Sequence, residues 1–487
     1  MAPRITSALF LALTAVAGLS QTPAFDHSPW LEDYGVMKQA LERTYANLAW
    51  FGSPESGVDV PALDQRTMAA LQSAKTDDEA RAAILAFVRG FHDGHFSQLR
   101  APAAAEAPAT RPDVSTMLRQ DPSTGCPALS NKQRSPAEFS RPFESLPGYR
   151  QLADGVTSPF RAAIVAAEGT GTSVGIVRIP EFEELHVSLC VELWPHDELW
   201  TRQGKLLRGP MRQAMEQRWY QTLADLLRTF RREGAAAVLI DIGNNSGGDD
   251  SGDIAARLFT ASAVHSSPLW MVQDPGAAGE YFDEQLDALG QTAAADAKVK
   301  ALVDQSLAVF TTGKSRLSDR SCVMDWVWHE RRAWGAQTCR RLVAAGSAGG
   351  PLDWLAPGVV NDADLATTLH WPARVATLWG AWTGPVYVLT DNRTYSSAEM
   401  FAAVLQNNRV AKTIGVRTGG DGCGFMNTPD PLVLPHSQLR FRVPNCVRLR
   451  ADGTDEVAGV APDLPVPVTD GAAKVLEALA ADVKRGR

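Results

Sequence analysis

Residues 386–425 read VYVLTDNRTYSSAEMFAAVLQNNRVAKTIGVRTGGDGCGF. The apolar run at 386–389 predicts a buried strand, followed by a polar turn, a helix from about Ser397, a second strand at 413–416 and a glycine-rich loop. A serine between a buried strand and a helix lies beside unpaired N–H groups and the positive end of the helix dipole. That position suits a nucleophile. The alternative is that Ser396 or Ser397 only caps the helix.

Two motifs in this chain resemble one family of enzymes. The run TYSSAEMFA, followed by IGVRTGGDG, resembles the nucleophile region of the tail-specific, or C-terminal processing, serine peptidases. Residues 235–248, AAAVLIDIGNNSGG, resemble the other signature of the family. In that family the nucleophile lies three residues before the Glu of the motif, so the resemblance implies Ser396 as the nucleophile. The likeness runs patchily from about residue 85 to 468.

The glycine-rich loop departs from the family pattern. In the bacterial and plastid processing peptidases this loop reads T-x-G-K-G, and its Lys is the general base. Here Asp421 occupies that position. A solvated Asp has a pKa near 4 and is a poor base for a serine hydroxyl. Arg417 cannot lose a proton, and we expect Lys412 to lie out of reach before the strand. The chain is therefore inert or uses another base.

A histidine near the N-terminus supplies a candidate base. The segment TDDE at 76–79 has the form of a capping box and predicts a helix that leads to FHDGHFS at 91–97. We expect Gly94 to end this helix and to place His95 on the exit loop. The run D-G-H-F resembles the D-x-H motif of family members that lack the Lys, in which this His is the base. The resemblance implies His95 as the base, whereas His92 has no matching position.

The remaining site residues are implied by the same resemblance. Residues 455–466, DEVAGVAPDLPV, resemble the segment that closes the family core. In that family an acid in this segment orients the His, which implies Glu456. Its neighbour Asp455 is an alternative candidate for the same role. A third alternative is that these acids only form an exposed turn. The glycine loop at 247–248 would supply an oxyanion-binding N–H from Gly247 or Gly248, with the N–H of Ser397 opposite. A simple turn, or a phosphate cradle without the P-loop Lys, are the alternatives.

Composition and the N-terminus indicate an exported enzyme. The 487 residues are 45% apolar with a formal charge of −8, which is typical of a globular protein of more than one domain. No basic cluster favours nucleic-acid binding. Residues 1–20 carry Arg4, an apolar run and an Ala-Val-Ala cleavage pattern, and predict a signal peptide. Because no later apolar run is long enough to span a bilayer, we expect a soluble periplasmic or secreted protein.

The cysteines favour disulfides over metal ligation. Six cysteines are an even number in an oxidising compartment, and none forms the C-x-x-C pair of a zinc site. Cys423 and Cys446 bracket two predicted strands at 431–434 and 438–443, so a bridge between them would hold the glycine loop beside Ser396. Cys322 and Cys339 could close the segment between them on itself.

These observations predict an α/β (α+β) protein. We expect a signal peptide at 1–20, an N-terminal helical domain at 25–100, a Pro/Ala-rich linker and irregular region at 101–170, a protease core at 171–468 with an insert at about 262–375, and a C-terminal helix at 469–487. The resemblance implies a crotonase-like ββα core with a mainly parallel sheet. We find no strand pattern and no carboxylate-binding loop before Gly171, and therefore expect no intact PDZ domain.

The predicted activity is that of an exported serine endopeptidase. Ser396 would form an acyl-enzyme with a polypeptide substrate, His95 would act as base and Glu456 would orient it; no metal and no other cofactor is implied. One alternative is an inert family member that binds peptide or an apolar ligand, and another is a serine esterase. The sequence predicts no oligomeric state.

Overall fold

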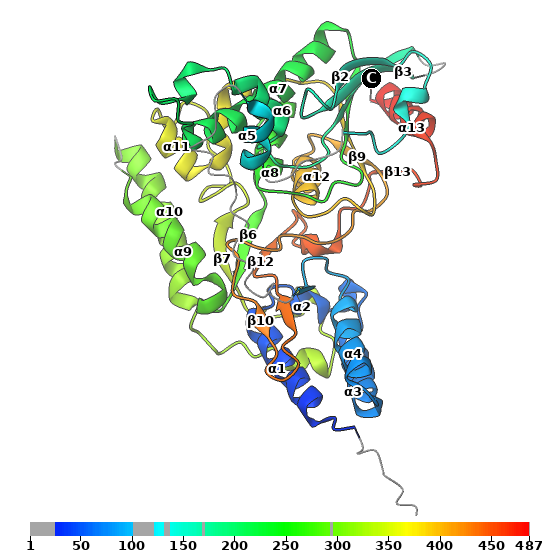
Figure 1. The fold of residues 1–487 in the computed structure, drawn as a ribbon, viewed down its shortest axis with the longest axis vertical. Coiled ribbons are helices and arrows are strands. Elements are labelled where there is room, and N and C mark those ends of the chain that lie inside the picture. Colours follow the sequence, from blue (N-terminus) through cyan, green and yellow to red (C-terminus); the bar gives the residue numbers. More distant parts are fainter. Residues whose placement is uncertain (1–24, 101–120, 131–136, 168–170, 293–295, 487) are drawn as a thin grey trace, which may run out of the picture.

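The computed structural model describes residues 25–100, 121–130, 137–167, 171–292 and 296–486, so the predicted signal peptide and most of the Pro/Ala-rich linker lie outside the described residues. At its centre is a seven-stranded sheet of order β13-β9-β8-β5-β4-β3-β2 (Figure 1). The strands are β2 (Arg150–Asp154), β3 (Arg161–Ala167), β4 (Thr172–Arg178), β5 (Ala237–Asp241), β8 (Val386–Thr390), β9 (Lys412–Gly415) and β13 (Leu464–Pro465).

Five neighbouring strands of this sheet, from β4 to β13, are parallel. Helix α7 (Arg208–Arg232) connects β4 to β5, and helix α12 (Ser397–Asn407) connects β8 to β9. Crossovers of this kind are what parallel strands require. Strands β5 and β8 are buried at every position, as expected for strands covered on both faces. The predicted strand, helix, strand order and the mainly parallel sheet are confirmed.

Strands β2 and β3 add an antiparallel edge to the sheet. They lie before Gly171, where the sequence analysis found no strand pattern. The run RAAIVAA of β3 is rich in Ala, which is depleted in strands, so local propensity does not reveal it. Pairing with β4 along seven residues imposes the strand. Nearby, α5 (Pro122–Leu129) is joined to α6 (Val187–Leu193) by the Cys126–Cys190 disulfide.

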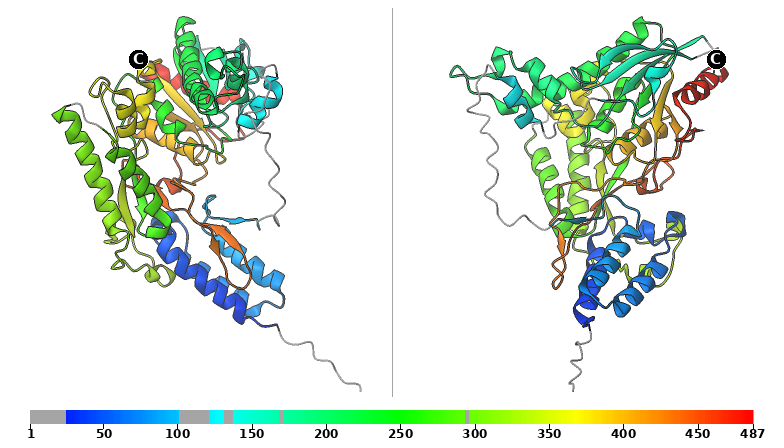
Figure 2. Two further views of the ribbon diagram at one scale, coloured as in Figure 1. Left: turned by 60° about the vertical axis from the view of Figure 1, so that its left-hand side comes forward. Right: turned by 45° about the vertical axis from the view of Figure 1, so that its right-hand side comes forward.

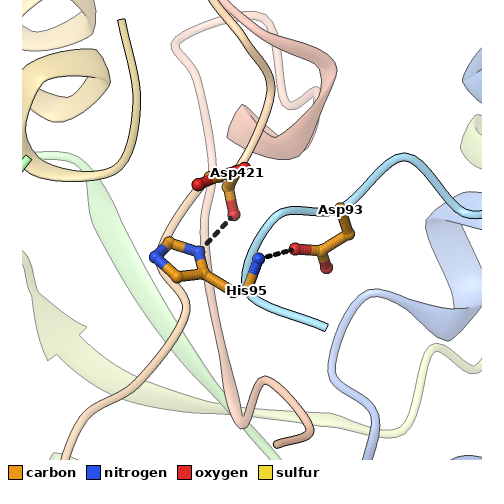
Figure 3. A group of neighbouring side chains, drawn as sticks. All are labelled: Asp93, His95 and Asp421. Carbon is orange, nitrogen blue, oxygen red and sulfur yellow. Dashed lines mark hydrogen bonds between the residues drawn. The ribbon is translucent and has the colours of Figure 1, made fainter. Parts of the chain in front are cut away.

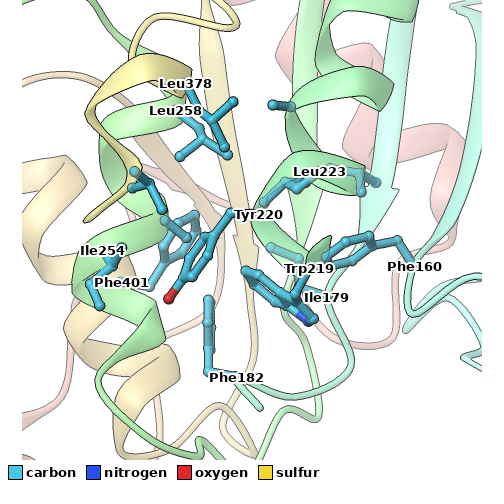
Figure 4. Packing of buried hydrophobic residues seen from close by; sticks show 14 of the residues in the cluster. Phe160, Ile179, Phe182, Trp219, Tyr220, Leu223, Ile254, Leu258, Leu378 and Phe401 are labelled. Atoms are coloured by element: carbon cyan, nitrogen blue, oxygen red, sulfur yellow. The ribbon is translucent and has the colours of Figure 1, made fainter. Parts of the chain in front are cut away.

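Helices cover both faces of the sheet. On one face, α7, α8 (Ser251–Ala255) and α12 build the largest apolar core, in which Trp219 and Tyr220 of α7 lie among Phe182 and Phe401 (Figure 4). On the other face, the amphipathic helix α13 (Ala472–Arg485) packs against strands β3 and β9. The predicted C-terminal helix is thus present and closes the second face.

The N-terminal region is helical and stands apart from the sheet, at the opposite end of the molecule (Figures 1 and 2). Its helices are α1 (Ser28–Thr44), α2 (Leu48–Phe51), α3 (Val60–Ser73) and α4 (Asp77–Arg89). Helix α4 ends at Arg89 with Gly90 as its C-cap, so the prediction that Gly94 ends it is wrong. Instead, Gly94 lies in the loop after the helix, where its N–H donates to the Asp421 carboxylate over 2.9 Å.

The segment within 262–375 connects the two ends of the molecule. Its elements are β6 (Pro268–Val272), α9 (Pro275–Gly290), α10 (Ala297–Arg316), β7 (Leu342–Ser347) and α11 (Ala363–Leu369). Strand β12 (Cys446–Arg448) pairs with β6, which pairs with β7. Trp326, Trp328 and Trp334 are buried in the N-terminal helical core.

Short pairings fasten the loops around the centre of the molecule. Strand β1 (Ser97–Leu99) follows the α4 loop and pairs with β11 (Arg440–Arg442), which pairs with β10 (Leu432–Val433). The Cys423–Cys446 and Cys322–Cys339 disulfides are both present as predicted. Among the described residues, no helix combines the length and apolar character needed to cross a membrane.

Candidate active site

Ser396 lies at the junction between β8 and α12. Its backbone has φ 56° and ψ −120°, a left-handed conformation that a residue with a side chain adopts only under constraint. Its N–H donates to Glu399 Oε2 over 3.2 Å. The strand and helix therefore hold this serine in a strained turn, as is common for nucleophiles placed at the start of a helix.

Glu399, one turn into α12, organises the glycine loop around the serine. Its side chain is fully buried, and burial raises its pKa to about 7. Every group that faces its two oxygens is a donor. Besides Ser396, these donors are Thr418 Oγ1 at 2.6 Å and the N–H groups of Gly420, Asp421 and Gly422 at 2.7, 2.8 and 3.1 Å. One carboxyl group thus fixes the loop relative to Ser396.

His95 reaches the same loop from the N-terminal region (Figure 3). Its Nδ1 lies 3.0 Å from the backbone carbonyl oxygen of Asp421, and its backbone N–H donates to Asp93 Oδ1 over 2.9 Å. Because a carbonyl oxygen only accepts, Nδ1 carries the proton and Nε2 keeps its lone pair. The imidazole lies against Gly424 and meets the Phe425 ring edge-on, with 5.7 Å between centroids. The tautomer is the one that a general base requires.

The charge of His95 is set by its surroundings. Burial lowers the pKa of the imidazole below its ordinary value, while the nearby Asp93 carboxylate opposes that shift. Asp93 is itself buried and accepts hydrogen bonds from Tyr45 Oη at 2.8 Å and Asn47 Nδ2 at 3.1 Å. His95 is therefore neutral near pH 7 and able to accept a proton.

Asp421 differs from what the sequence suggested. From the sequence alone we expected a solvated side chain, yet Asp421 is only 8% exposed and its carboxylate accepts the Gly94 N–H. Burial and the neighbouring Asp93 raise its pKa to about 7. The loop and the segment around Gly94 enclose it, which the sequence alone does not show. Its backbone anchors His95, and its side chain anchors the turn that precedes His95.

Glu456 lies on the far side of the glycine loop. It belongs to the short 3-10 turn η9 (Glu456–Ala458), is fully buried, and pairs through Oε2 with Arg448 Nε at 2.5 Å. Arg448 Nη2 also donates to the carbonyl oxygens of Gly422 at 2.9 Å and Ser396 at 3.4 Å. Within the described chain, no hydrogen bond joins Glu456 to His95, and Glu456 Oε1 has no partner. Asp455 is buried beside it, so the exposed-turn alternative is wrong.

The paired glycines approach the serine closely. A Cβ on Gly247 would lie 2.6 Å from the Ser396 Cβ, and one on Gly248 would lie 1.8 Å from the Phe182 carbonyl oxygen. The Gly247 N–H is used, since it donates to Asn245 Oδ1 over 2.8 Å. Within the described residues the Gly248 N–H has no acceptor. Of the two glycines, Gly248 is therefore the one with a donor to offer a ligand.

A cavity of about 590 Å³ brings these groups together, with His95, Ser396, Ser397, Gly248, Asp421 and Arg448 among its lining residues. It combines a strained serine, a neutral imidazole with an available lone pair, and free backbone donors. This set of groups suits acyl transfer to a serine.

Comparison with known proteins agrees with this chemistry. The sequence profile of Peptidase family S41 matches residues 173–466. The chain belongs to peptidase family S41. It is similar to the structure of mature CPAF, a chlamydial protease, complexed with lactacystin, with 13% identity and a TM-score of 0.53 over 94% of this chain and 97% of that one. A second structure of mature CPAF gives 15% identity and a TM-score of 0.51 over the same shares. At this identity the likeness shows the fold alone. None of the curated proteins matches the chain.

In this S41 chain, the structure places four of the predicted site residues, Ser396, Ser397, His95 and Gly248, around one cavity. Glu456 contacts this group through Arg448. In the sequence, Glu399 served only to distinguish Ser396 from Ser397, and its structural role was missed. The signal was available, because a Glu three residues after a serine at a helix start is a recognised capping pattern.

Asp93, His95 and Asp421 also offer ligand atoms that lie within 4.8 Å of one another, a spacing that suits a metal ion. The Asp93 oxygens and the His95 Nδ1 proton are already engaged in hydrogen bonds. Asp93 accepts four hydrogen bonds through its two oxygens, and the His95 Nδ1 proton points to a backbone carbonyl. In this S41 chain the group is better described as the hydrogen-bond network that holds His95.

Proposed function

We propose that this chain is an exported serine endopeptidase in which Ser396 is the nucleophile and His95 is the base. The observation that carries the proposal is the hydrogen bond from His95 Nδ1 to the Asp421 carbonyl. It leaves Nε2 as the acceptor on an imidazole that lines the same cavity as Ser396. Membership of family S41 supports a serine-type hydrolase acting on peptides.

The reaction follows from these positions. His95 Nε2 takes the hydroxyl proton as Ser396 attacks the peptide carbonyl, and later delivers that proton to the leaving amine. The oxyanion accepts hydrogen bonds from the N–H groups of Gly248 and Ser397, while Gly247 provides the room for close approach to the serine. Each such donor typically contributes about 3 kcal/mol to transition-state stabilisation. Water then hydrolyses the acyl-enzyme.

Glu456 has a positioning role in this proposal. Its carboxylate pairs with Arg448, and the guanidinium fastens the carbonyl oxygens of Ser396 and Gly422. The pair thereby holds the turn that carries Ser396 against the glycine loop. In that loop the carbonyl of Asp421, the residue before Gly422, anchors His95. That Glu456 orients His95 directly stays a prediction.

Export is part of the proposal. Three disulfides join the cysteines in pairs, which is typical of proteins that fold outside the cytoplasm. Together with the signal-peptide pattern at 1–20, they support a periplasmic or secreted protein that acts on polypeptides.

The test is covalent labelling of the purified mature protein with a fluorophosphonate probe, followed by mapping of the labelled peptide. We expect labelling of Ser396 that is absent in Ser396→Ala and unaffected in Ser397→Ala. Digestion of unfolded casein, compared with hydrolysis of short acyl esters, separates a peptidase from an esterase. A folded protein with intact disulfides that is not labelled and cleaves neither substrate would instead be the inert, ligand-binding member of the family.

A further inference from the structure

Two carboxylates follow the oxyanion loop directly. Asp249 and Asp250 come immediately after Gly248, and both line the cavity that contains Ser396. The loop is fixed by two backbone hydrogen bonds of 2.9 Å, from the Phe182 N–H to the Gly247 carbonyl and from the Asp249 N–H to the Phe182 carbonyl. The two acidic side chains are therefore held beside the nucleophile.

Among the described residues, the cations of the cavity form no ion pair with these two side chains, although the charge of Arg448 acts on Asp250 from a distance. Arg448 is buried, and its donors are committed to Glu456 and to backbone carbonyls. The Arg442 guanidinium lies over the Phe425 ring, with its central carbon 3.7 Å from the ring centroid. A half-open polar cavity lined by carboxylates attracts a cation.

The two carboxylates also differ in burial and in hydrogen bonding. Asp249 is exposed and uses Oδ1 to accept the Ser251 N–H at 2.9 Å, so its second oxygen is open to a ligand. Asp250 is half-buried, and burial together with the charge of Asp249 raises its pKa to about 6. Behind them, the buried Glu184 is balanced by Arg374, which pairs with it at 2.9 Å. Among the described residues, neither Asp249 nor Asp250 forms an ion pair with Arg374 or Arg448, whose closest carboxylate partners are Glu184 and Glu456.

We infer that Asp249 and Asp250 select substrates with a Lys or Arg side chain next to the scissile bond. The inference rests on the proposed peptidase function and names its substrate class. An ammonium or guanidinium group placed between the two carboxylates relieves their repulsion and makes charge-assisted hydrogen bonds, which a neutral side chain of equal length cannot make. An acidic side chain at the same place is repelled.

The test compares quenched fluorescent peptides that differ at a single position. Lys, norleucine or Glu is placed on either side of a cleavage site found by mass spectrometry of casein digests. For the wild type we expect kcat/KM for the Lys peptide to exceed that for the norleucine peptide at least tenfold on one side of the bond, with the Glu peptide slowest. In Asp249→Asn/Asp250→Asn the preference for Lys over norleucine should fall below threefold.

The variants are chosen to preserve the fold. Asn keeps the oxygen at position 249 that accepts the Ser251 N–H, and thermal unfolding checks that the double variant is folded. Asp287→Asn, at an exposed position on α9, is the matched control and should keep the preference for Lys. The charge-reversed Asp249→Lys variant should prefer the Glu peptide.

The outcomes separate the inference from the proposed function. Labelling of Ser396 and cleavage of casein without any preference for Lys overturns the charge selection and leaves the peptidase intact. A preference for Lys that survives in the double variant overturns the assignment to these two residues. A folded protein with neither labelling nor cleavage overturns the proposed function and this inference with it.

Discussion

The imidazole Nδ1 of His95 donates its proton to the backbone carbonyl of Asp421 over 3.0 Å. Asp421, which the sequence resemblance places at the position of a Lys, contacts His95 through its backbone and the Gly94 N–H through its side chain. Asp421 thus holds both the imidazole of His95 and the backbone of the residue before it.

The first prediction assigns the base. His95→Asn keeps a donor near the position of Nδ1 but removes Nε2, and should slow fluorophosphonate labelling of Ser396 by about 10²- to 10⁴-fold, the usual contribution of a general base. Asp421→Asn keeps the carbonyl and an oxygen for the Gly94 N–H, so labelling should stay within about tenfold of wild type. Stopped-flow or gel-based labelling rates measure both. The reverse order of effects would make Asp421, whose pKa is about 7, the base.

A second prediction concerns Glu399. Glu399→Gln replaces one accepting carboxylate oxygen by an NH₂ group, which is a donor. At least one buried N–H therefore loses its hydrogen-bond acceptor. We expect a loss of about 2–3 kcal/mol of unfolding free energy and slower labelling of Ser396, measured by urea unfolding and by the probe. Glu284→Gln, on the exposed side of α9, is the control and should leave both quantities unchanged. Wild-type stability in Glu399→Gln would refute the anchoring role.

The sequence predicts those parts of the site that depend on local pattern. Ser396 lies between an apolar strand and a helix, and Cys423 and Cys446 bracket a hairpin, so each is visible in a short window. The anchoring of His95 is not visible in a short window, because its partner Asp421 lies 326 positions away in the sequence. The contact is also made by a backbone carbonyl, which every residue type has, so no residue identity indicates it. The burial of Asp421 was missed for the same reason. It depends on the glycine loop and the segment around Gly94, which come together only in the folded protein.

Strand β3 shows a second limit of the sequence. Its Ala-rich run favours no strand, and only the long antiparallel contact with β4 makes it one. The mainly parallel centre of the sheet was predictable because its strands are continuous apolar runs ended by turn residues. Edges that depend on tertiary pairing are the part of this fold that local pattern does not reveal.

A third prediction tests the oxyanion loop. Gly248 has φ 151°, and a methyl group there would meet the Phe182 carbonyl. Gly248→Ala should therefore displace the N–H that we assign to the oxyanion and lower kcat by about 10²- to 10³-fold, as for the loss of one such donor. Gly279→Ala, in helix α9 where no atom lies within 4 Å of the new Cβ, should keep full activity and gain up to about 1 kcal/mol of stability. Equal activity of the two variants would remove Gly248 from the site.

A fourth prediction concerns stability and pH. Burial raises the pKa of Asp455 to about 8, far above its ordinary value of 3.8. The folded protein therefore binds this proton more tightly than the unfolded chain, so the stabilisation is complete below about pH 4 and is lost as the pH rises through 8. Asp455→Asn does not titrate. Its unfolding free energy relative to wild type should increase by roughly 1–3 kcal/mol between pH 5 and pH 8.5.

Urea unfolding at a series of pH values measures this difference. Asp287→Asn, which changes an exposed carboxylate, should show no such dependence on pH. A difference that is constant with pH would mean that Asp455 titrates in the folded protein as it does in the unfolded chain.

The last prediction concerns the Cys423–Cys446 disulfide. Cys423 lines the active-site cavity, and its neighbour Gly424 lies against the His95 ring. Removing the bridge frees the loop from β12, which lies 23 residues further along the chain. In Cys423→Ser/Cys446→Ser we expect Ser396 to label at least tenfold more slowly, together with a loss of about 3 kcal/mol of stability. In Cys322→Ser/Cys339→Ser, whose bridge lies in the insert, stability should also fall, but labelling should change less than threefold. If both pairs slow labelling equally, the effect is one of general stability, and the bridge has no particular part in holding His95.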